Sequence, residues 1–146
     1  MGRWRPAKNP IAMLLRLAAA AAVPLLAACV TTAPLSCAGG AAPTPVAELV
    51  FGRNIGPRLG VGEAAWRAFL DAEVTPRFPD GFTVLDARGQ WRDGAAIVRE
   101  PSKVLVVALT DEARDRASLA AIADAYKARF HQQSVLTMVR QACVSF

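Results

Sequence analysis

TPRFPDGFTVLDARGQWRDGAAIVREPSKVLVVAL, residues 75–109, is the stretch that decides the fold. After a Pro-Asp-Gly turn signal, residues 82–92 are rich in strand-forming side chains. Asp93-Gly94 is a signal for a tight turn between two strands. Residues 96–109 return as the second strand and end in VLVVAL, which is apolar on both faces, as in the centre of a sheet. The stretch therefore predicts a long antiparallel hairpin within a larger sheet.

The length of the turn sets which charged residues lie opposite each other in this hairpin. A two-residue loop at Asp93-Gly94 would place Arg88 opposite Arg99, and like charges directly opposite are destabilising. A three-residue loop with Gly94 in the left-handed region places Arg88 opposite Glu100 instead. We predict the second register, with an Arg88–Glu100 pair.

The segments on either side of the hairpin add two strands and two helices. Residues 46–53 are predicted as a strand, and a helix is predicted from Glu63 to just before Pro76, where a proline ring ends it. Thr110, Asp111 and Glu112 signal the start of a second helix, and residues 134–146 close the chain as a strand. The expected buried stripes are Trp66, Phe69, Leu70 and Val74 in the first helix, and Leu119, Ile122, Ala123, Tyr126 and Phe130 in the second.

This order of elements is strand, helix, strand, strand, helix, strand. It is the split βαβ pattern of ferredoxin-like folds. We therefore expect an α+β domain, a ferredoxin-like βαββαβ fold with a four-stranded antiparallel sheet and two helices on one face. In that topology the first and third strands are central, and the fourth strand lies beside the first.

The N-terminal segment has the layout of an export signal. Arg3, Arg5, Lys8 and Arg16 precede an apolar run that is too short to span a bilayer as a helix. The run ends in LAAC, residues 26–29, which resembles the lipobox of bacterial lipoproteins. This predicts a lipoprotein signal peptide over residues 1–28, a lipid anchor on Cys29 and a flexible tether over residues 29–45, followed by the domain at 46–146. An ordinary secretory peptide or a weak membrane anchor are the alternatives.

A lipid on Cys29 would place the domain in the cell envelope, on the periplasmic side of a membrane. Val30 follows the cysteine. In the lipoprotein signals of Gram-negative bacteria that this segment resembles, an Asp directly after the cysteine usually retains the protein at the inner membrane. Because Val30 stands at that position, the resemblance favours the outer membrane if the host is Gram-negative.

The basic character of the chain belongs mostly to the N-terminal segment. The whole sequence has 17 Lys and Arg and 12 Asp and Glu, a net charge of +5. Four of the basic residues and none of the acidic ones precede Cys29, so residues 29–146 carry 13 cations and 12 anions, a net charge of +1. A nucleic-acid-binding domain needs a persistent basic patch, so nucleic acid is not expected as a partner.

Cysteine usage agrees with export. If Cys29 is lipidated, Cys37 and Cys143 remain, and two cysteines in an oxidising compartment suggest a disulfide. In the expected topology the end of the last strand lies near the start of the first, which brings the two cysteines together. Two free thiols are the alternative.

Several blocks of sequence carry a family resemblance. They are FGRNI at 51–55, TPRFPDGFTVLDARGQW at 75–91, REPSKV at 99–104, YKARF at 126–130 and ACVSF at 142–146. Over residues 48–146 the chain resembles the bacterial proteins of domain of unknown function 3574. The resemblance implies an exported protein, often with a lipoprotein signal, and implies no reaction.

The hairpin charges form the candidate site. Strand alternation puts Asp86 and Arg88 on one face, and the predicted register adds Glu100 to it. If this is the face without helices, these residues and Arg53 could bind a small polar ligand. A structural ion-pair network, or polar contacts within a sheet-to-sheet homodimer, are the alternatives. His131 is the only histidine, and Cys37 and Cys143 are expected to be bridged, so no metal cluster is expected. No catalytic residue and no cofactor are assigned.

Two functions are compatible with these features. The first is a non-enzymatic binding or interaction module of the envelope whose sheet face binds a partner or a second copy. The second is a small dimeric α+β-barrel-type enzyme or small-ligand binder with a polar site on the sheet face. The second rests on fold analogy, which is weak evidence for function.

Overall fold

The structure is a computed structural model that describes residues 35–146. The predicted signal peptide, Cys29 and the beginning of the tether lie outside the described residues. The elements are β1 (Ala42–Gly52), β2 (Asn54–Ile55), β3 (Arg58–Leu59), α1 (Glu63–Phe69), a π-helical turn η1 (Leu70–Val74), β4 (Thr83–Asp93), β5 (Ala96–Ala108), α2 (Glu112–Phe130) and β6 (Leu136–Val144).

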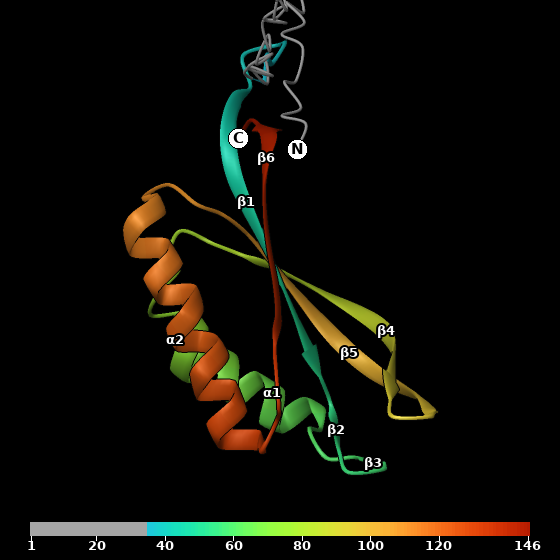
Figure 1. The fold of residues 1–146 in the computed structure, drawn as a ribbon. Coiled ribbons are helices and arrows are strands. Elements are labelled where there is room, and N and C mark those ends of the chain that lie inside the picture. The colour runs from blue at the N-terminus through green and yellow to red at the C-terminus, as the bar shows by residue number, and fades with distance from the viewer. Residues whose placement is uncertain (1–34) are drawn as a thin grey trace, which may run out of the picture. The chain divides into compact units, whose positions relative to one another are not determined.

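The main sheet has four antiparallel strands in the order β4-β5-β1-β6. β1 and β5 are central and β6 lies beside β1, as predicted. Both helices cover the same face of this sheet, which is the ferredoxin-like arrangement (Figure 1). β2 and β3 form a separate two-stranded ribbon between β1 and α1. The predicted α+β fold class is confirmed.

An aromatic cluster fills the space between the sheet and the helices. Phe51 of β1 lies at its centre, with its ring centroid 5.2 Å from that of Trp66 and 4.8 Å from that of Tyr126. Phe69 and Phe130 extend the cluster along the helices. The two predicted helix stripes supply most of it, because Trp66, Phe69, Val74, Leu119, Ile122, Tyr126 and Phe130 are all buried. The unit Ala33–Phe146 thus holds the whole hydrophobic core among the described residues.

The predicted register of the hairpin is wrong. Arg88 lies opposite Pro101, and Glu100 lies opposite Gly89, so the Arg88–Glu100 pair does not form. The loop is Gly94-Ala95, because the last strand pair is Asp93 with Ala96. Gly94 has φ +56°, and a type II′ turn requires glycine at its first central position. A type I′ loop at Asp93-Gly94 would require a positive φ at Asp93 as well. Asp93 has no positive φ and is the last paired residue of β4.

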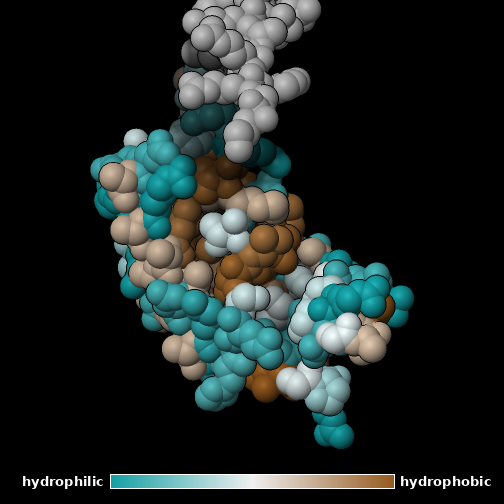
Figure 2. Space-filling model, viewed as in Figure 1, coloured by the Kyte–Doolittle hydropathy of each residue, from teal (hydrophilic) through white to brown (hydrophobic). Residues whose placement is uncertain are grey.

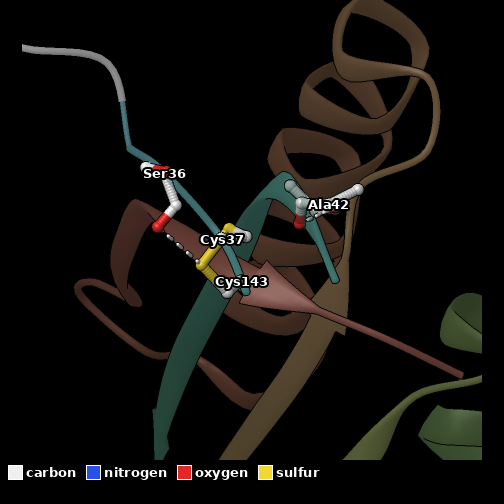
Figure 3. The surroundings of a disulfide bond; sticks show 5 residues. Ser36, Cys37, Ala42 and Cys143 are labelled. Carbon is white, nitrogen blue, oxygen red and sulfur yellow. Dashed lines mark hydrogen bonds between the residues drawn. A yellow bond between two sulfur atoms is a disulfide. The ribbon is translucent and has the colours of Figure 1, made fainter. Parts of the chain in front are cut away.

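The beginning of β1 and the end of β6 are joined covalently. Cys37 and Cys143 form a disulfide, with their Cα atoms 5.5 Å apart (Figure 3). β1 begins at Ala42, which pairs with Val144, so the last four residues of the predicted tether are part of the sheet. The disulfide therefore fixes the point at which the chain enters the domain.

Candidate functional site

The face of the sheet opposite the helices has no covering element among residues 35–146. We call it the open sheet face. Its apolar side chains include Leu85, Leu136 and Met138, which are 51%, 57% and 44% exposed. Register places them on the same face as Val46, Val50, Val104 and Val106, which are half-buried. Figure 2 shows apolar surface in the middle of the molecule, between the helices and the β4–β5 hairpin. Side chains of this kind are normally covered in a folded protein.

One ion pair lies within the open sheet face. The Arg140 guanidinium is 2.6 Å from the Glu48 carboxylate, and the Arg140 side chain is 68% exposed while that of Glu48 is 20% exposed. Their strands are neighbours, with Glu48 opposite Met138. The pair keeps this largely apolar surface close to neutral.

A second group of charges lies on the helix-covered face, where β1 and β5 meet α1. The Lys103 ammonium is 3.1 Å from the Glu63 carboxylate and also pairs with Asp86. The Arg53 guanidinium is 2.8 Å from Glu63, and its Nε donates to the Val61 carbonyl at 2.7 Å. The two cations are buried, whereas the carboxylates of Glu63 and Asp86 reach solvent.

These contacts hold all of the charges in place. The hydrogen bond from Lys103 lowers the pKa of both Glu63 and Asp86, and the nearby Arg53 charge adds to this. The hydrogen bond to Asp86 raises the pKa of Lys103 against the opposing effect of burial. Each pKa moves away from neutrality, so these groups are poor general acids or bases at pH 7. The arrangement is that of a structural ion-pair network.

Glu100 lies on the open sheet face at the base of the hairpin. Its carboxylate accepts hydrogen bonds from the Trp91 indole at 3.1 Å and from the Asn54 backbone N–H at 3.3 Å. It sits over Gly52, where a Cβ atom would come within 2.6 Å of the carboxylate oxygen. Glu100 thus ties the hairpin to the β1–β2 junction.

The four predicted site residues do not form one cluster. Arg53 and Asp86 come together through Lys103 and Glu63, on the helix-covered face. Arg88 shares the face of Asp86, whereas Glu100 points to the opposite face. The expected common face of Asp86, Arg88 and Glu100 is therefore wrong, and the cause is the one-residue shift of the register.

Lys103 and Glu63 take part in this network without having been predicted from the sequence. Lys103 lies two and four residues before the buried Leu105 and Val107, so its side chain points to the same face of the strand. The assignment of VLVVAL to a central strand therefore implies that Lys103 points toward the core. Glu63 was predicted only as the start of the first helix. Nothing in the local sequence indicates that its carboxylate reaches β5.

No group of three or more His, Cys, Asp or Glu within residues 35–146 could hold a metal ion. His131 ends α2 with φ +52°, and its backbone N–H donates to the Lys127 carbonyl. In the same part of the chain, no helix has the length and apolar character needed to cross a membrane.

Solved structures share this fold at low sequence identity. A phage SAM lyase in the apo state has a TM-score of 0.53 and 15% identity, over 78% of this chain and 98% of the lyase. A phage SAM lyase in complex with S-methyl-5′-thioadenosine gives a TM-score of 0.53 and 16% identity, over 77% and 97% of the two chains. CutA from Synechococcus elongatus gives 0.46 and 13%, over 69% and 78%. At this identity the lyase structures establish the fold alone.

A comparison with curated proteins finds no match. The sequence profile described as "Protein of unknown function (DUF3574)" matches residues 46–146. This range covers the sheet from within β1 to its last strand, both helices and the open sheet face. The chain therefore belongs to the DUF3574 family.

Proposed function

We propose that this protein is an exported, lipid-anchored protein of the bacterial cell envelope that acts as a non-enzymatic interaction module and pairs with a second copy of itself. The observation that carries the proposal is the open sheet face. A four-stranded sheet with helices on one side only leaves its other apolar side to be covered by a partner.

The size of the open sheet face suits a stable interface. The four strands have 9 to 13 residues each. With strands about 4.8 Å apart and about 3.4 Å per residue, such a sheet covers roughly 600 Å² in plan. This approaches the area of about 800 Å² that each partner contributes to a standard interface.

The charges of this face favour a second copy over a strongly charged partner. Glu48 and Arg140 place one anion and one cation in its apolar centre, whereas Glu100 lies away from that centre at the base of the hairpin. Two identical copies related by a two-fold axis would meet with the same patch, so the surface must be compatible with itself. An apolar centre with one acid and one base meets that condition. Packing of two sheets face to face is a common way to complete such a core.

The N-terminal sequence supports the location. The charged start, the apolar run and LAAC at 26–29 predict cleavage before Cys29 and its lipidation. Membrane anchoring would hold copies in one plane and raise their effective concentration for pairing. Mass spectrometry of the mature N-terminus checks this part: we expect a diacylglyceryl-modified Cys29, and an unmodified start at another residue would contradict it.

Pairing is tested with the soluble chain Ala33–Phe146. Light scattering should give twice the mass of one chain for the native sequence and the mass of one chain for Leu136→Glu. Leu59→Glu is the matched control, because Leu136 and Leu59 are both 57% exposed and Leu59 lies outside the open sheet face. A native chain that stays monomeric, or equal effects of both substitutions, would contradict self-association.

A further inference from the structure

In the outer part of the β4–β5 hairpin, the basic side chains lie on one face and the acidic side chains on the other. Register places Arg88 and Arg92 of β4 and Arg99 of β5 on one face, which is the continuation of the helix-covered face. We call it the basic hairpin face. Glu100 and Asp93 have the opposite parity and point to the other face. The hairpin turns away from both helices, so neither helix covers this surface (Figure 1).

The three arginines are close to one another and lack acidic partners. Arg99 is the diagonal neighbour of both Arg88 and Arg92 across the two strands. Diagonal neighbours on one face lie about 7–8 Å apart, within reach of long side chains. Within residues 35–146 none of the three forms an ion pair. All three are exposed, and Figure 2 shows the hairpin as mostly hydrophilic.

A hollow lies along the same part of the hairpin. It measures about 570 Å³, and its lining comes from both faces of the strands: Asp86, Arg88, Gln90 and Arg99 on the basic hairpin face, and Glu100 and Ser102 on the other face. Its volume falls in the range of about 300–1,000 Å³ that is usual for small-ligand sites. The two carboxylates of the lining are engaged elsewhere, Asp86 by Lys103 and Glu100 by the Trp91 indole. An anion would therefore sit further out, beside Arg88 and Arg99, where Gln90 lies opposite Arg99 on the same face.

We infer that the basic hairpin face binds a soluble ligand that carries a phosphate group. Guanidinium groups bind phosphate through paired, charge-assisted hydrogen bonds, and a doubly charged group can engage more than one arginine. A bound anion would also offset the mutual repulsion of the three cations. This site goes beyond the proposed pairing of copies, because its three arginines lie on the face of the hairpin opposite to the apolar side chains of the open sheet face.

The geometry favours a soluble phosphate over a lipid headgroup. The chain enters the domain at the Cys37–Cys143 disulfide, where β1 begins. The hairpin leaves the sheet at the other end of β1, beyond Gly52, which pairs with Ser102. The 11 residues of β1 span roughly 35 Å. If the proposed lipid anchor holds, the basic hairpin face would thus lie at the end of the domain farther from its attachment point.

The inference is tested by thermal unfolding of the chain Ala33–Phe146 in increasing inorganic phosphate, with chloride at matched ionic strength as reference. We expect a saturable rise in melting temperature, which gives an apparent Kd. Arg88→Gln and Arg99→Gln should each raise this Kd about tenfold or more, since each removes a charge-assisted contact. Arg67→Gln, on the exposed side of α1, removes the same charge and should leave the Kd unchanged.

Three outcomes would overturn the inference. The first is the absence of a saturable effect beyond chloride. The second is an equal effect of Arg67→Gln, which would show general screening of positive charge. The third is binding to phosphatidylglycerol vesicles that depends on Arg88 while free phosphate has no effect, because this would assign the surface to a lipid headgroup.

Discussion

Gly52 shows how closely single residues are fitted at the base of the hairpin. A Cβ atom there would meet the Glu100 carboxylate at 2.6 Å. Glu100 could move away only by giving up its hydrogen bonds from Trp91 and Asn54. We therefore expect Gly52→Ala to lower the free energy of unfolding by about 1–3 kcal/mol, the usual range for overpacking.

Urea unfolding measures this effect, and Gly62→Ala is its control. Gly62 has φ −74° and no atom within 4 Å of its Cβ position, so alanine fits there. If the contact with Glu100 is the cause, Gly52→Ala should cost much less in a Glu100→Ala background. Equal costs in both backgrounds would exclude the carboxylate as the source.

The ion-pair network around Lys103 can be tested by comparing the loss of stability when the cation is removed with the loss when its carboxylate partners are removed. Lys103→Met replaces a buried cation by an apolar side chain and leaves two solvent-exposed carboxylates, so its cost should be small. The double variant Glu63→Gln, Asp86→Asn leaves the buried ammonium without an anionic partner and should be clearly less stable. Melting temperatures at pH 7 rank the two variants, and the reverse order would contradict a structural role for the network.

The same network predicts a pH dependence. The folded-state pKa values of Glu63 and Asp86 lie below their ordinary values of 4.5 and 3.8, so their contribution is complete above about pH 5 and is lost as the pH falls through the lowered values. The pKa of Lys103 lies above 10.5, so its contribution is complete at neutral pH and is lost only as the pH rises through the raised value. Melting curves of Asp86→Asn should fall less steeply below pH 4 than those of the native chain.

Among the elements, the β4–β5 turn decides which side chains meet. Gly94 has φ +56°, where a residue with a Cβ atom costs about 1–2 kcal/mol. Gly94→Ala should therefore lower the free energy of unfolding by that amount. Gly94→Asn should cost about as much, because the first central position of a type II′ turn differs in ψ from the left-handed region that asparagine tolerates. Chemical unfolding compares the two, and a clearly smaller loss for asparagine would argue against this turn geometry.

The sequence was sufficient for the elements and insufficient for their exact register. Apolar periodicity and the Pro76 stop predicted α1, and the stripe from Leu119 to Phe130 predicted α2, because these signals are local. The hairpin register depends on whether Asp93 belongs to the loop or to the strand. The local sequence does not distinguish the two, and the pairing of β4 with β5 places Asp93 in the strand. With Asp93 in the strand, the residue opposite Arg88 is Pro101 instead of the predicted Glu100. The common face of Asp86, Arg88 and Glu100 was predicted from that register, so it was wrong for the same reason.

The disulfide acts at the scale of the whole domain, because it joins residues 106 positions apart. Closing a loop of about 100 residues is worth up to about 4.7 kcal/mol in the chain-entropy model, and measured values are typically about 2–4 kcal/mol. We expect the Cys37→Ser, Cys143→Ser variant to lose stability within that range in urea unfolding. A reducing agent should destabilise the native chain and leave this variant unchanged, and an effect on both would contradict the assignment.

The central claim at the same scale is that the open sheet face pairs with a second copy. Glu48→Arg places two cations in the apolar centre of this face, and Arg140→Glu places two anions there. Each variant alone must bury like charges against like charges, whereas a mixture of the two can bury opposite charges.

Native mass spectrometry of the chain Ala33–Phe146 tests this claim directly. We predict dimers for the native chain, monomers for each variant alone, and a one-to-one heterodimer when the two variants are mixed. A native chain that is monomeric, or variants that remain dimeric alone and do not exchange on mixing, would contradict pairing through this face.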